Sequence, residues 1–285
     1  MEQSIKALQG IPDFSEEDIW RYSRNILLPE VGWPGQRLFR SGRVMVVGAG
    51  GIGSAALLYL AAAGVGQIGI ADGDTVEISN LQRQILYKVG DLGRWKVESA
   101  KESILALNPH CRVETYATRL EAANIREVLR GYDIVLDASD NFPTRFLVAD
   151  CCWIEQISLV SAAATGFQGL LLAVVPGQGS PCYRCLVPQA PQISWQEGIL
   201  GAVAGTMGSL QAMEALKLLL GRGSKMARRC LSYDALKCRF HIMERTRAPQ
   251  CPLCGDNPSI TNLEHHTSAA GLEAGLPRKL ALTTD

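Results

Sequence analysis

Short apolar or β-branched runs alternate with longer stretches of helical character through the first half of the chain. The runs predict strands at 43–47, 67–71, 112–116 and 134–137. The stretches between them predict helices at 54–63, 96–107 and 122–130. Such alternation predicts an α/β fold with a doubly wound, mostly parallel, Rossmann-like sheet.

The second half has a different pattern. Strands are predicted at 159–164 and 169–175, and one strand with its turn at 230–240. A long helix is predicted at 203–220, where apolar residues recur at three- and four-residue steps. Residues 256–285 contain no aromatic residue and end in a polar, threonine-rich sequence, so we expect a disordered tail. The predicted organisation is one Rossmann-like domain over 1–255, followed by this tail.

Composition and charge exclude some classes of protein. The 285 residues are 47% hydrophobic and 20% charged, which is typical of a globular domain with a sizeable core. Lys plus Arg and Asp plus Glu number 28 each, so a general nucleic-acid or anionic-membrane surface is not indicated. The first ten residues lack the apolar core of a secretory signal, and no apolar stretch reaches the roughly 18 residues of a membrane span. We expect a cytoplasmic protein.

A glycine-rich loop follows the first predicted strand. Its glycines, Gly48, Gly50, Gly51 and Gly53, leave backbone N–H groups open to an anion at the start of the next helix. Asp72 stands about 20 residues further on, at the end of the next strand, where a carboxylate can accept both ribose hydroxyls. The loop and Asp72 together fit NAD, FAD, S-adenosylmethionine or ATP, and the alternative is a glycine-rich turn that binds nothing.

Polar and cationic residues follow Asp72 at high density. Arg83 and Lys96 suit an enzyme that breaks the α–β phosphate link, because negative charge builds up on the α-phosphate and on the departing pyrophosphate. We assign both residues to phosphates, and Asn80 to a phosphate or to metal positioning. The alternative is that Arg83 and Lys96 are solvated surface cations.

Asp140 and Asn141 follow another apolar strand. In a doubly wound sheet, ligands collect at the carboxyl ends of strands, so Asp140 can hold Mg²⁺ against a triphosphate. The alternative is that Asp140 caps the helix that follows.

Four of the nine cysteines form two C-x-x-C pairs. Cys182, Cys185, Cys251 and Cys254 have the spacing of a closed, structural zinc site with four thiolates. Such a site would link the middle of the chain to the C-terminal end of the domain. We expect this zinc-bound part to extend the sheet at its C-terminal side. A redox C-x-x-C pair is the rival interpretation. The remaining cysteines show no ligand spacing and are expected to be buried thiols: Cys111, Cys151, Cys152, Cys230 and Cys238.

These motifs together resemble the MoeB/ThiF/HesA family, the bacterial relatives of ubiquitin-activating enzymes, over about residues 15–255. The resemblance rests on segments at 21–24, 48–53, 72, 79–84, 96–100, 108–109, 137–141, 181–185, 205–215 and 251–254. It implies a homodimer that binds ATP and Mg²⁺ and adenylylates the C-terminal glycine of a small ubiquitin-fold sulfur carrier ending in Gly-Gly. The carrier then receives sulfur as a thiocarboxylate.

The resemblance also implies roles for individual residues. Asp72 would hold ribose, Asn80, Arg83 and Lys96 would serve the phosphates, and Asp140 would coordinate Mg²⁺. Arg24 would reach into the partner subunit's site, and the four paired cysteines would bind structural zinc. The other implied nucleotide contacts are Ser79, Leu81, Gln82 and Asn141.

One position departs from the family pattern. Many relatives carry a cysteine where this chain has Ser194, and a serine is a far poorer nucleophile than a thiolate. We therefore expect sulfur to come from a separate donor, either a sulfurtransferase or a cysteine desulfurase. The alternative is that Cys151, Cys152 or Cys230 takes over the role. The sequence shows no rhodanese-like domain after residue 255.

Three other functions fit parts of the sequence. The family includes members that adenylylate a short peptide or a modified tRNA base. The glycine loop alone also fits an NAD-dependent oxidoreductase, although that leaves Arg83, Lys96 and Asp140 without a role. A zinc-stabilised scaffold without turnover is the non-enzymatic alternative. The resemblance leaves the pathway open, since molybdopterin, thiamine and thiolated siderophores all use such carriers.

Overall fold

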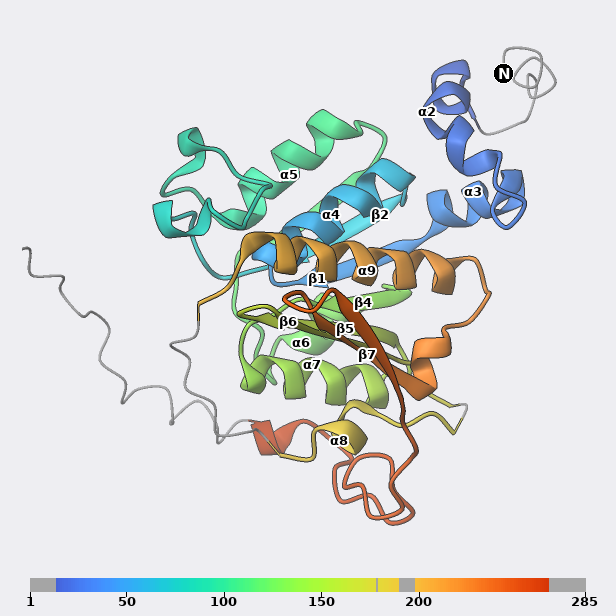
Figure 1. The fold of residues 1–285 in the computed structure, drawn as a ribbon, viewed down its shortest axis with the longest axis vertical. Helices are drawn as coiled ribbons and strands as arrows, with labels where there is room; N and C mark the ends of the chain where they lie inside the picture. The colour runs from blue at the N-terminus through green and yellow to red at the C-terminus, as the bar shows by residue number, and fades with distance from the viewer. Residues whose placement is uncertain (1–13, 178, 190–197, 267–285) are drawn as a thin grey trace, which may run out of the picture.

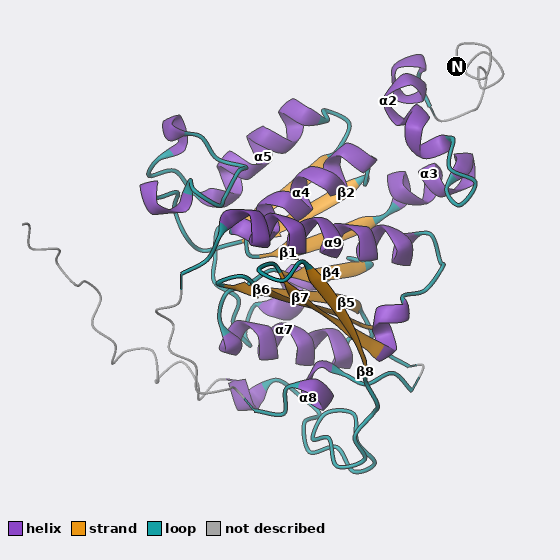
Figure 2. Ribbon diagram, in the orientation of Figure 1, coloured by secondary structure: helices purple, strands orange, loops and turns teal. Residues whose placement is uncertain are grey.

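An eight-stranded sheet organises the chain, which we describe from a computed structural model over residues 14–177, 179–189 and 198–266. The strand order is β3-β2-β1-β4-β5-β6-β7-β8 (Figures 1 and 2). Pairs from β3 through β5 are parallel, and the last three pairs are antiparallel. The strands are β1 (Arg43–Val47), β2 (Gln67–Ala71), β3 (Arg112–Tyr116), β4 (Ile134–Asp137), β5 (Ser158–Thr165), β6 (Gln168–Val174), β7 (Arg229–Asp234) and β8 (Arg239–Glu244).

Helices lie on both faces of this sheet, which confirms the doubly wound prediction (Figure 2). The α-helices are α2 (Glu16–Ile26), α3 (Gly32–Ser41), α4 (Gly51–Ala63), α5 (Lys96–Leu107), α6 (Ile125–Leu129), α7 (Phe142–Ile154), α8 (Tyr183–Leu186) and α9 (Gly201–Leu219). The 3₁₀ turns are η1 (Ile78–Asn80), η2 (Val89–Asp91), η3 (Lys225–Arg228) and η4 (Glu264–His266). In the described part of the chain, no helix is both long and apolar enough to cross a membrane.

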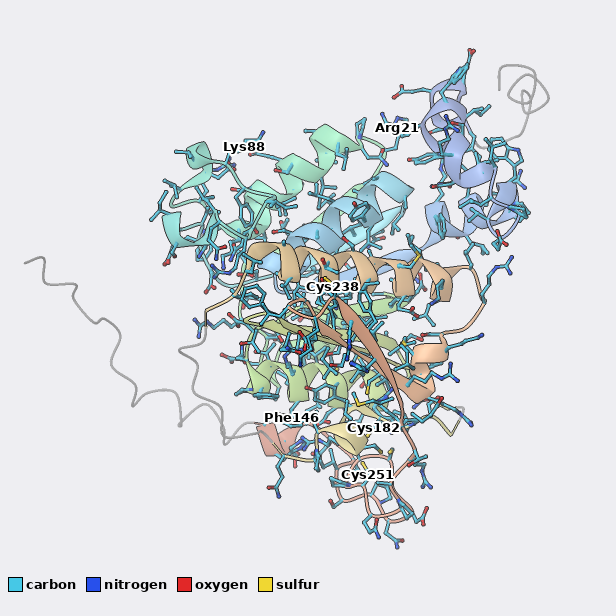
Figure 3. All side chains as sticks on the ribbon, in the orientation of Figure 1. Arg21, Lys88, Phe146, Cys182, Cys238 and Cys251 are labelled. Atoms are coloured by element: carbon cyan, nitrogen blue, oxygen red, sulfur yellow. The ribbon has the colours of Figure 1, made fainter. Side chains whose placement is uncertain are left out.

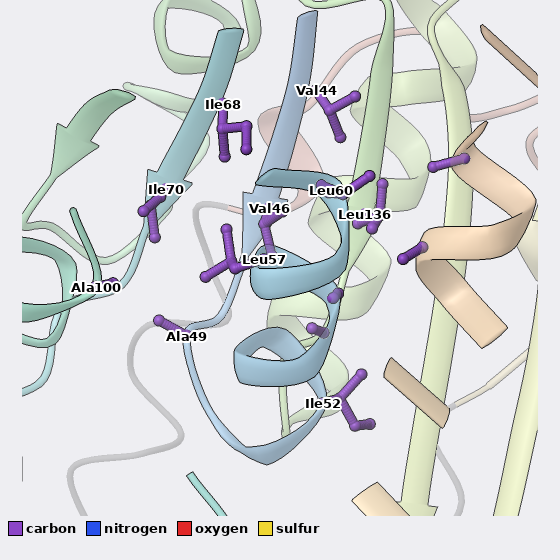
Figure 4. Packing of buried hydrophobic residues seen from close by; sticks show 14 of the residues in the cluster. Val44, Val46, Ala49, Ile52, Leu57, Leu60, Ile68, Ile70, Ala100 and Leu136 are labelled. Carbon is purple, nitrogen blue, oxygen red and sulfur yellow. The ribbon is translucent and has the colours of Figure 1, made fainter. Parts of the chain in front are cut away.

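The inner strands of the sheet, from β2 to β6, are buried on both faces. Side chains alternate along a strand, so Val44 and Val46 of β1 face the cluster beneath α4, α5 and α9, whereas Met45 and Val47 face the cluster beneath α6 and α7. Figure 4 shows the first cluster, in which β1 and β2 pack against Leu57 and Leu60 of α4. Because both faces are covered there, the inner parallel strands β1, β2 and β4 are largely apolar runs, which is why their positions could be predicted from the sequence.

Helices α4 and α9 cross at very short range because of Gly208. A Cβ added there would lie within 3.0 Å of the Ile52 carbonyl oxygen, a separation that real Cβ atoms essentially never show. The Gly208→Ala change is therefore expected to lower the free energy of unfolding by about 1–3 kcal/mol or more, as overpacking forces the helices apart. Urea unfolding measures the change.

Gly205 provides the matched control, since it lies one turn earlier in α9 and an added Cβ would meet nothing within 4 Å. The Gly205→Ala change is expected to stabilise the chain by about 0.5–1 kcal/mol through helix propensity. Equal effects of the two changes would contradict the close crossing.

Two predicted segments are wrong in detail. The expected single strand at 230–240 is the hairpin β7–β8, and all six residues of β8 are exposed, so β8 lacks the alternation that marks a half-buried strand. The predicted tail begins too early, because Leu263 is buried in the core and η4 packs on α7. The rest of the predicted tail, 267–285, lies outside the described residues.

Candidate active site

The strand order reverses beside β1, where β2 and β3 lie on one side and β4 onward on the other. The carboxyl ends of β1 and β4 are adjacent, with Val47 paired to Asp137 and the Ala138 amide donating to the Val47 carbonyl at 2.8 Å. Ligands of open α/β sheets bind at such a reversal, because the connections diverge there and leave a crevice. The glycine loop leaves β1 at this point, and Asp140 follows β4.

The glycine loop requires its glycines for close packing. Gly48 has φ +91°, and an added Cβ would lie 2.8 Å from the Ala138 carbonyl oxygen. A Cβ on Gly53 would collide with the carbonyl oxygen of Gly48 itself. Gly50 is the N-cap of α4 and supplies no side chain to cap it. The first N–H groups of α4 therefore point outward as a site for an anion.

The Ala49 peptide between these glycines is held on both sides. Asp72, at the end of β2, accepts from the Ala49 amide at 2.8 Å and from the Asp74 amide at 2.9 Å. Burial raises the pKa of Asp72, and the nearby Lys96 charge opposes that rise. The Tyr87 hydroxyl donates to the Ala49 carbonyl at 2.7 Å, and burial raises the Tyr87 pKa so that it stays a donor. Asp72 is therefore placed at the loop, and its oxygens keep lone pairs that suit ribose hydroxyls.

Arg83 lies across the start of α4. A Cβ on Gly51 would come within 3.3 Å of the Arg83 Cγ, and a Cβ on Gly201, at the start of α9, within 3.0 Å of the Arg83 Cα. Its guanidinium donates to the Ser79 carbonyl at 3.0 Å, which turns the side chain back over η1. The structure thus brings Arg83 to the glycine loop, although Arg83 lies 30 residues after Gly53 in the sequence.

The other predicted nucleotide contacts between residues 79 and 83 differ in burial. Asn80 is buried, and its side chain accepts from the Glu77 amide at 3.2 Å and donates to the Ser79 hydroxyl at 3.3 Å, so it holds the η1 turn. Leu81 packs against the core, whereas Gln82 is exposed. Their contacts with a nucleotide remain predictions.

Lys96 is not a solvated helix residue, so that alternative is wrong. It is the first residue of α5 and only 6% exposed. Its Nζ lies 3.0 Å from Asp74 Oδ2, and its charge acts on Asp72. The buried cation therefore stands beside the carboxylate at the glycine loop.

Asp140 is exposed and does not cap α7. The N-cap is Asn141, whose side chain accepts from the Thr144 amide at 2.9 Å, so the alternative for Asp140 is wrong. The Asn141 amide donates to Asp140 Oδ1 at 3.3 Å and orients that carboxylate at the mouth of the site. A solvent-facing carboxylate at the carboxyl edge suits Mg²⁺, which retains several waters when bound.

A buried hydrogen-bond network, which no sequence motif indicates, supports the loop that carries Asp140. Arg145 of α7 donates to Asp137 Oδ2 at 3.1 Å, to the Ala162 carbonyl at 2.9 Å and to the Ser139 carbonyl. The Ser161 hydroxyl completes the network with a 2.7 Å bond to Asp137. Arg145 thus holds the loop before Asp140, as Tyr87 holds the glycine loop.

Arg24 is not near the site of its own chain. Helix α2 packs on the far end of α4, where Tyr22 contacts the position of Gly64 and accepts from Asn108 Nδ2 at 2.8 Å. The 13 residues of α4 separate this end from the glycine loop by about 20 Å. In Figure 1, α2 lies beyond the right-hand end of α4.

The four paired cysteines converge as predicted. Their sulfur atoms all lie within 4.8 Å of one another. The measured Sγ separations are 3.4 Å for Cys182–Cys251, 3.2 Å for Cys185–Cys254 and 3.9 Å for Cys182–Cys185 (Figure 3 labels Cys182 and Cys251). A tetrahedral zinc with Zn–S bonds near 2.3 Å needs sulfurs about 3.8 Å apart, so the set fits this ion. The Ala248 amide also donates to Cys185 Sγ at 3.4 Å, as is usual behind a thiolate ligand.

A second polar cluster, unforeseen from the sequence, surrounds Asp150 of α7. Arg184, between the first two cysteines, binds both Asp150 oxygens at 2.8 and 2.7 Å, and the Nε2 atoms of His265 and His266 lie 3.1 and 2.9 Å from Oδ2. Burial works against the charged carboxylate, but the bonds from His266 and Arg184 outweigh it and lower the Asp150 pKa. With a guanidinium bound to both oxygens, the cluster is an ion-pair network rather than a cation site. It ties residues 256–266 to α7.

The remaining cysteines differ in exposure. Cys111, Cys151, Cys152 and Cys230 are buried as predicted, but Cys238 is exposed in the β7–β8 turn, so that prediction is wrong. Burial raises the pKa of Cys111 to about 11 and of Cys151 to about 12, and also raises the pKa of Cys152 and Cys230. Buried thiols that resist ionisation are poor nucleophiles. Ser194 lies outside the described residues.

Comparison with known proteins agrees with this geometry. The ThiF family model matches residues 22–253, and the chain belongs to this family of nucleotide-binding α/β proteins. It is 43% identical over 268 residues to the Thermus thermophilus sulfur carrier protein adenylyltransferase, covering 91% of this chain and 99% of that protein. It is 45% identical over 257 residues to the Haloferax volcanii SAMP-activating enzyme E1, covering 88% and 94%.

The chain is also similar to part of a longer protein and to a solved structure. The chain is 46% identical over 249 residues to the Zea mays adenylyltransferase and sulfurtransferase MOCS3-1, covering 85% of this chain but only about half (53%) of that protein. The crystal structure of E. coli MccB with ATP superposes with a TM-score of 0.70 at 23% identity, over 82% of this chain and 74% of MccB. This likeness shows a shared fold.

Proposed function

We propose that the protein uses ATP to adenylylate the C-terminal carboxylate of a small ubiquitin-fold sulfur carrier, which prepares the carrier for thiocarboxylate formation. The observation that carries the proposal is the convergence of Arg83, the buried Lys96 and Asp72 on an uncapped helix N-terminus, with Asp140 at the adjoining strand end. Relatives named for this activity match nearly the full length of the chain at 43–45% identity.

The reaction is an in-line displacement at the α-phosphorus. A carboxylate oxygen of the carrier forms the new O–P bond, the bond to the β-phosphate oxygen breaks, and pyrophosphate leaves with the electron pair. Arg83, Lys96 and the N–H groups of α4 stabilise the charge that builds up, while Asp72 holds the ribose. Asp140 would hold Mg²⁺, which would neutralise part of the triphosphate charge. The four paired cysteines would hold structural Zn²⁺.

Sulfur comes from a separate donor in this proposal. Ser194 stands where many relatives have a cysteine, and Cys151, Cys152 and Cys230 are all fully buried. No reactive thiolate is therefore expected at these positions to accept the carrier or a persulfide. The donor would be a sulfurtransferase or a cysteine desulfurase acting on the adenylate.

Pyrophosphate exchange tests the activity directly. Radiolabel from pyrophosphate is expected to enter ATP when the protein, Mg²⁺ and a carrier ending in Gly-Gly are all present. A carrier lacking its last glycine is the control and is expected to give no exchange. Exchange that depends on a short peptide or an RNA in place of the carrier would favour the alternative acceptors.

We also propose a homodimer in which Arg24 of each subunit completes the partner's site, because α2 lies about 20 Å from the glycine loop of its own chain. Mixing Arg24→Ala and Lys96→Ala chains, each of low activity alone, is expected to restore about a quarter of the sites, since half of the dimers are mixed and one site in each is intact. Exchange rates after subunit mixing measure this recovery. An Arg24 that acts within its own chain would give no recovery.

A further inference from the structure

The turn at 182–185, which carries the first two cysteines of the cluster, packs directly on α7. The Tyr183 ring meets the Phe146 ring edge-on, with the ring centroids 5.7 Å apart (Figure 3 labels Phe146). The Arg184 guanidinium lies 4.6 Å from the centroid of the same ring and binds the Asp150 carboxylate at 2.8 and 2.7 Å. The cysteine-bearing turn therefore fixes one side of α7.

Tyr183 also reaches Arg145, the residue before Phe146 on this helix. Only 5% of Tyr183 is exposed. Burial raises the pKa of Tyr183 to about 12, whereas the charge of Arg145 and a hydrogen bond from Arg145 to the Tyr183 hydroxyl oppose this rise. The carboxylate of Asp137 acts on the same hydroxyl. The cysteine-bearing turn thus contacts the buried ion pair at the end of β4.

Arg145 extends this contact to the loop that carries Asp140. Its guanidinium donates to the Ser139 carbonyl, which belongs to the peptide that joins Ser139 to Asp140. The same guanidinium is anchored by Asp137 Oδ2 at 3.1 Å and by the Ala162 carbonyl at 2.9 Å. The Ser139 amide in turn donates to Asp137 Oδ1 at 3.1 Å. The backbone direction at Asp140 therefore depends on where Arg145 is held.

The Asp140 carboxylate itself has little direct support. It is exposed, and within the described part of the chain one hydrogen bond reaches it, from the Asn141 side-chain amide at 3.3 Å. A Mg²⁺ ligand has to be held within narrow limits, because this ion demands near-ideal octahedral geometry. The peptide before Asp140 is therefore the main element that can orient this side chain.

We propose that Tyr183 and Arg145 are positioning residues, which couple the cysteine-bearing turn to the loop that holds Mg²⁺ and so set the direction of the Asp140 carboxylate. The connection is contiguous: a residue next to a cysteine contacts the guanidinium that holds the peptide before the metal ligand. Such a connection is established only by measured coupling between its members. The inference rests on the proposed function, because it takes Asp140 as the Mg²⁺ ligand.

Tyr183→Phe tests the coupling, because it removes the hydroxyl and leaves the ring on Phe146. ATP in the presence of Mg²⁺ is expected to bind this variant about three- to tenfold more weakly in calorimetry, the usual effect of one lost hydrogen bond. ATP in magnesium-free buffer is expected to bind within twofold of the wild type, since the loss acts through the metal ligand. Zinc content by mass spectrometry is expected to stay at that of the wild type.

Tyr132→Phe is the matched control. Tyr132 is 6% exposed, and its hydroxyl donates to Glu114 Oε2 of β3 at 3.0 Å, so the change also removes a buried tyrosine hydroxyl. This variant is expected to bind ATP like the wild type both with and without Mg²⁺.

Arg145→Lys supplies the second arm of a double-mutant cycle. Lysine keeps a positive charge for Asp137, but its single nitrogen cannot replace the several bonds of the guanidinium. The same Mg²⁺-selective loss is expected, and adding Tyr183→Phe is expected to change the ATP·Mg²⁺ affinity by less than twofold further. Losses that multiply would overturn the inference, as would equal losses for Tyr183→Phe with and without Mg²⁺. If Arg145→Lys does not fold, the Tyr183→Phe comparison decides alone.

Asp140→Asn separates the inference from the function on which it rests. It is expected to show the largest Mg²⁺-selective loss of ATP affinity. Unchanged ATP·Mg²⁺ binding by Asp140→Asn would overturn the Mg²⁺ assignment itself. Weakened binding by Asp140→Asn beside ATP·Mg²⁺ affinity within twofold of the wild type in Tyr183→Phe would overturn the coupling alone.

Discussion

Lys96→Ala is expected to lower the rate of carrier-dependent pyrophosphate exchange about 10²–10³-fold, the usual cost of removing one preorganised stabilising group. The effect is large because Lys96 is a buried cation, held 3.0 Å from Asp74 and close to Asp72. In such a setting water screens the charge poorly, so its interaction with a phosphate is strong. Steady-state exchange with saturating ATP and carrier measures the loss.

The fold is expected to survive this change. Asp74 is about half exposed, so water can solvate it once Lys96 is gone, and the free energy of unfolding changes by about 1 kcal/mol or less. Lys101→Ala, further along α5, is the control and is expected to retain full exchange. A Lys96→Ala enzyme with a near-normal rate would remove Lys96 from the proposed chemistry.

Cys251→Ser is expected to abolish stoichiometric zinc binding and to lower the free energy of unfolding by about 4 kcal/mol or more, because loss of a metal is among the most damaging single changes. The melting temperature would fall by about 10 °C. The reason is geometric: Cys251 pairs with Cys182 across the sequence at 3.4 Å, so one substitution opens the link between the two segments. Zinc content by mass spectrometry and calorimetric unfolding measure both effects.

Cys238→Ser is the matched control, since Cys238 is exposed and lies outside the four-sulfur cluster. It is expected to retain one zinc per chain and the parental melting temperature. A Cys251→Ser protein that still holds one zinc, or a parental protein in which the four cysteines form disulfides, would contradict the structural-metal assignment.

Much of the fold was predictable because burial leaves a clear pattern. The predicted strands at 43–47, 67–71 and 134–137 coincide with β1, β2 and β4, since strands covered on both faces are largely apolar runs. The prediction at 112–116 coincides with the edge strand β3, which is only partly buried and is marked by its β-branched and aromatic residues instead. The exposed strand β8 carries no such pattern and was missed.

Residues of the candidate site could be predicted where a chemically suitable side chain or glycine lies directly at the end of a predicted strand or the start of a predicted helix. The glycine loop and Asp72 follow strand ends and Lys96 begins a helix, so sequence position alone predicts that they lie at one edge of the sheet. The contacts of Arg83 and Tyr87 with the glycine loop depend on how the 78–91 segment folds back over the start of α4, which no spacing encodes. The same holds for Asp150 and its histidine partners, which come together from segments 115 and 116 residues apart.

Helix α7 has one end in each of two distinct parts of the molecule. Asn141 caps its first turn beside the Asp140 carboxylate. In its third turn, Asp150 accepts two hydrogen bonds from Arg184, which lies between Cys182 and Cys185. The cysteine pair that positions the turn with Arg184 therefore also positions the guanidinium that neutralises the buried Asp150 carboxylate. Opening of the four-cysteine cluster would therefore free this arginine and leave the buried Asp150 carboxylate with its histidine partners alone.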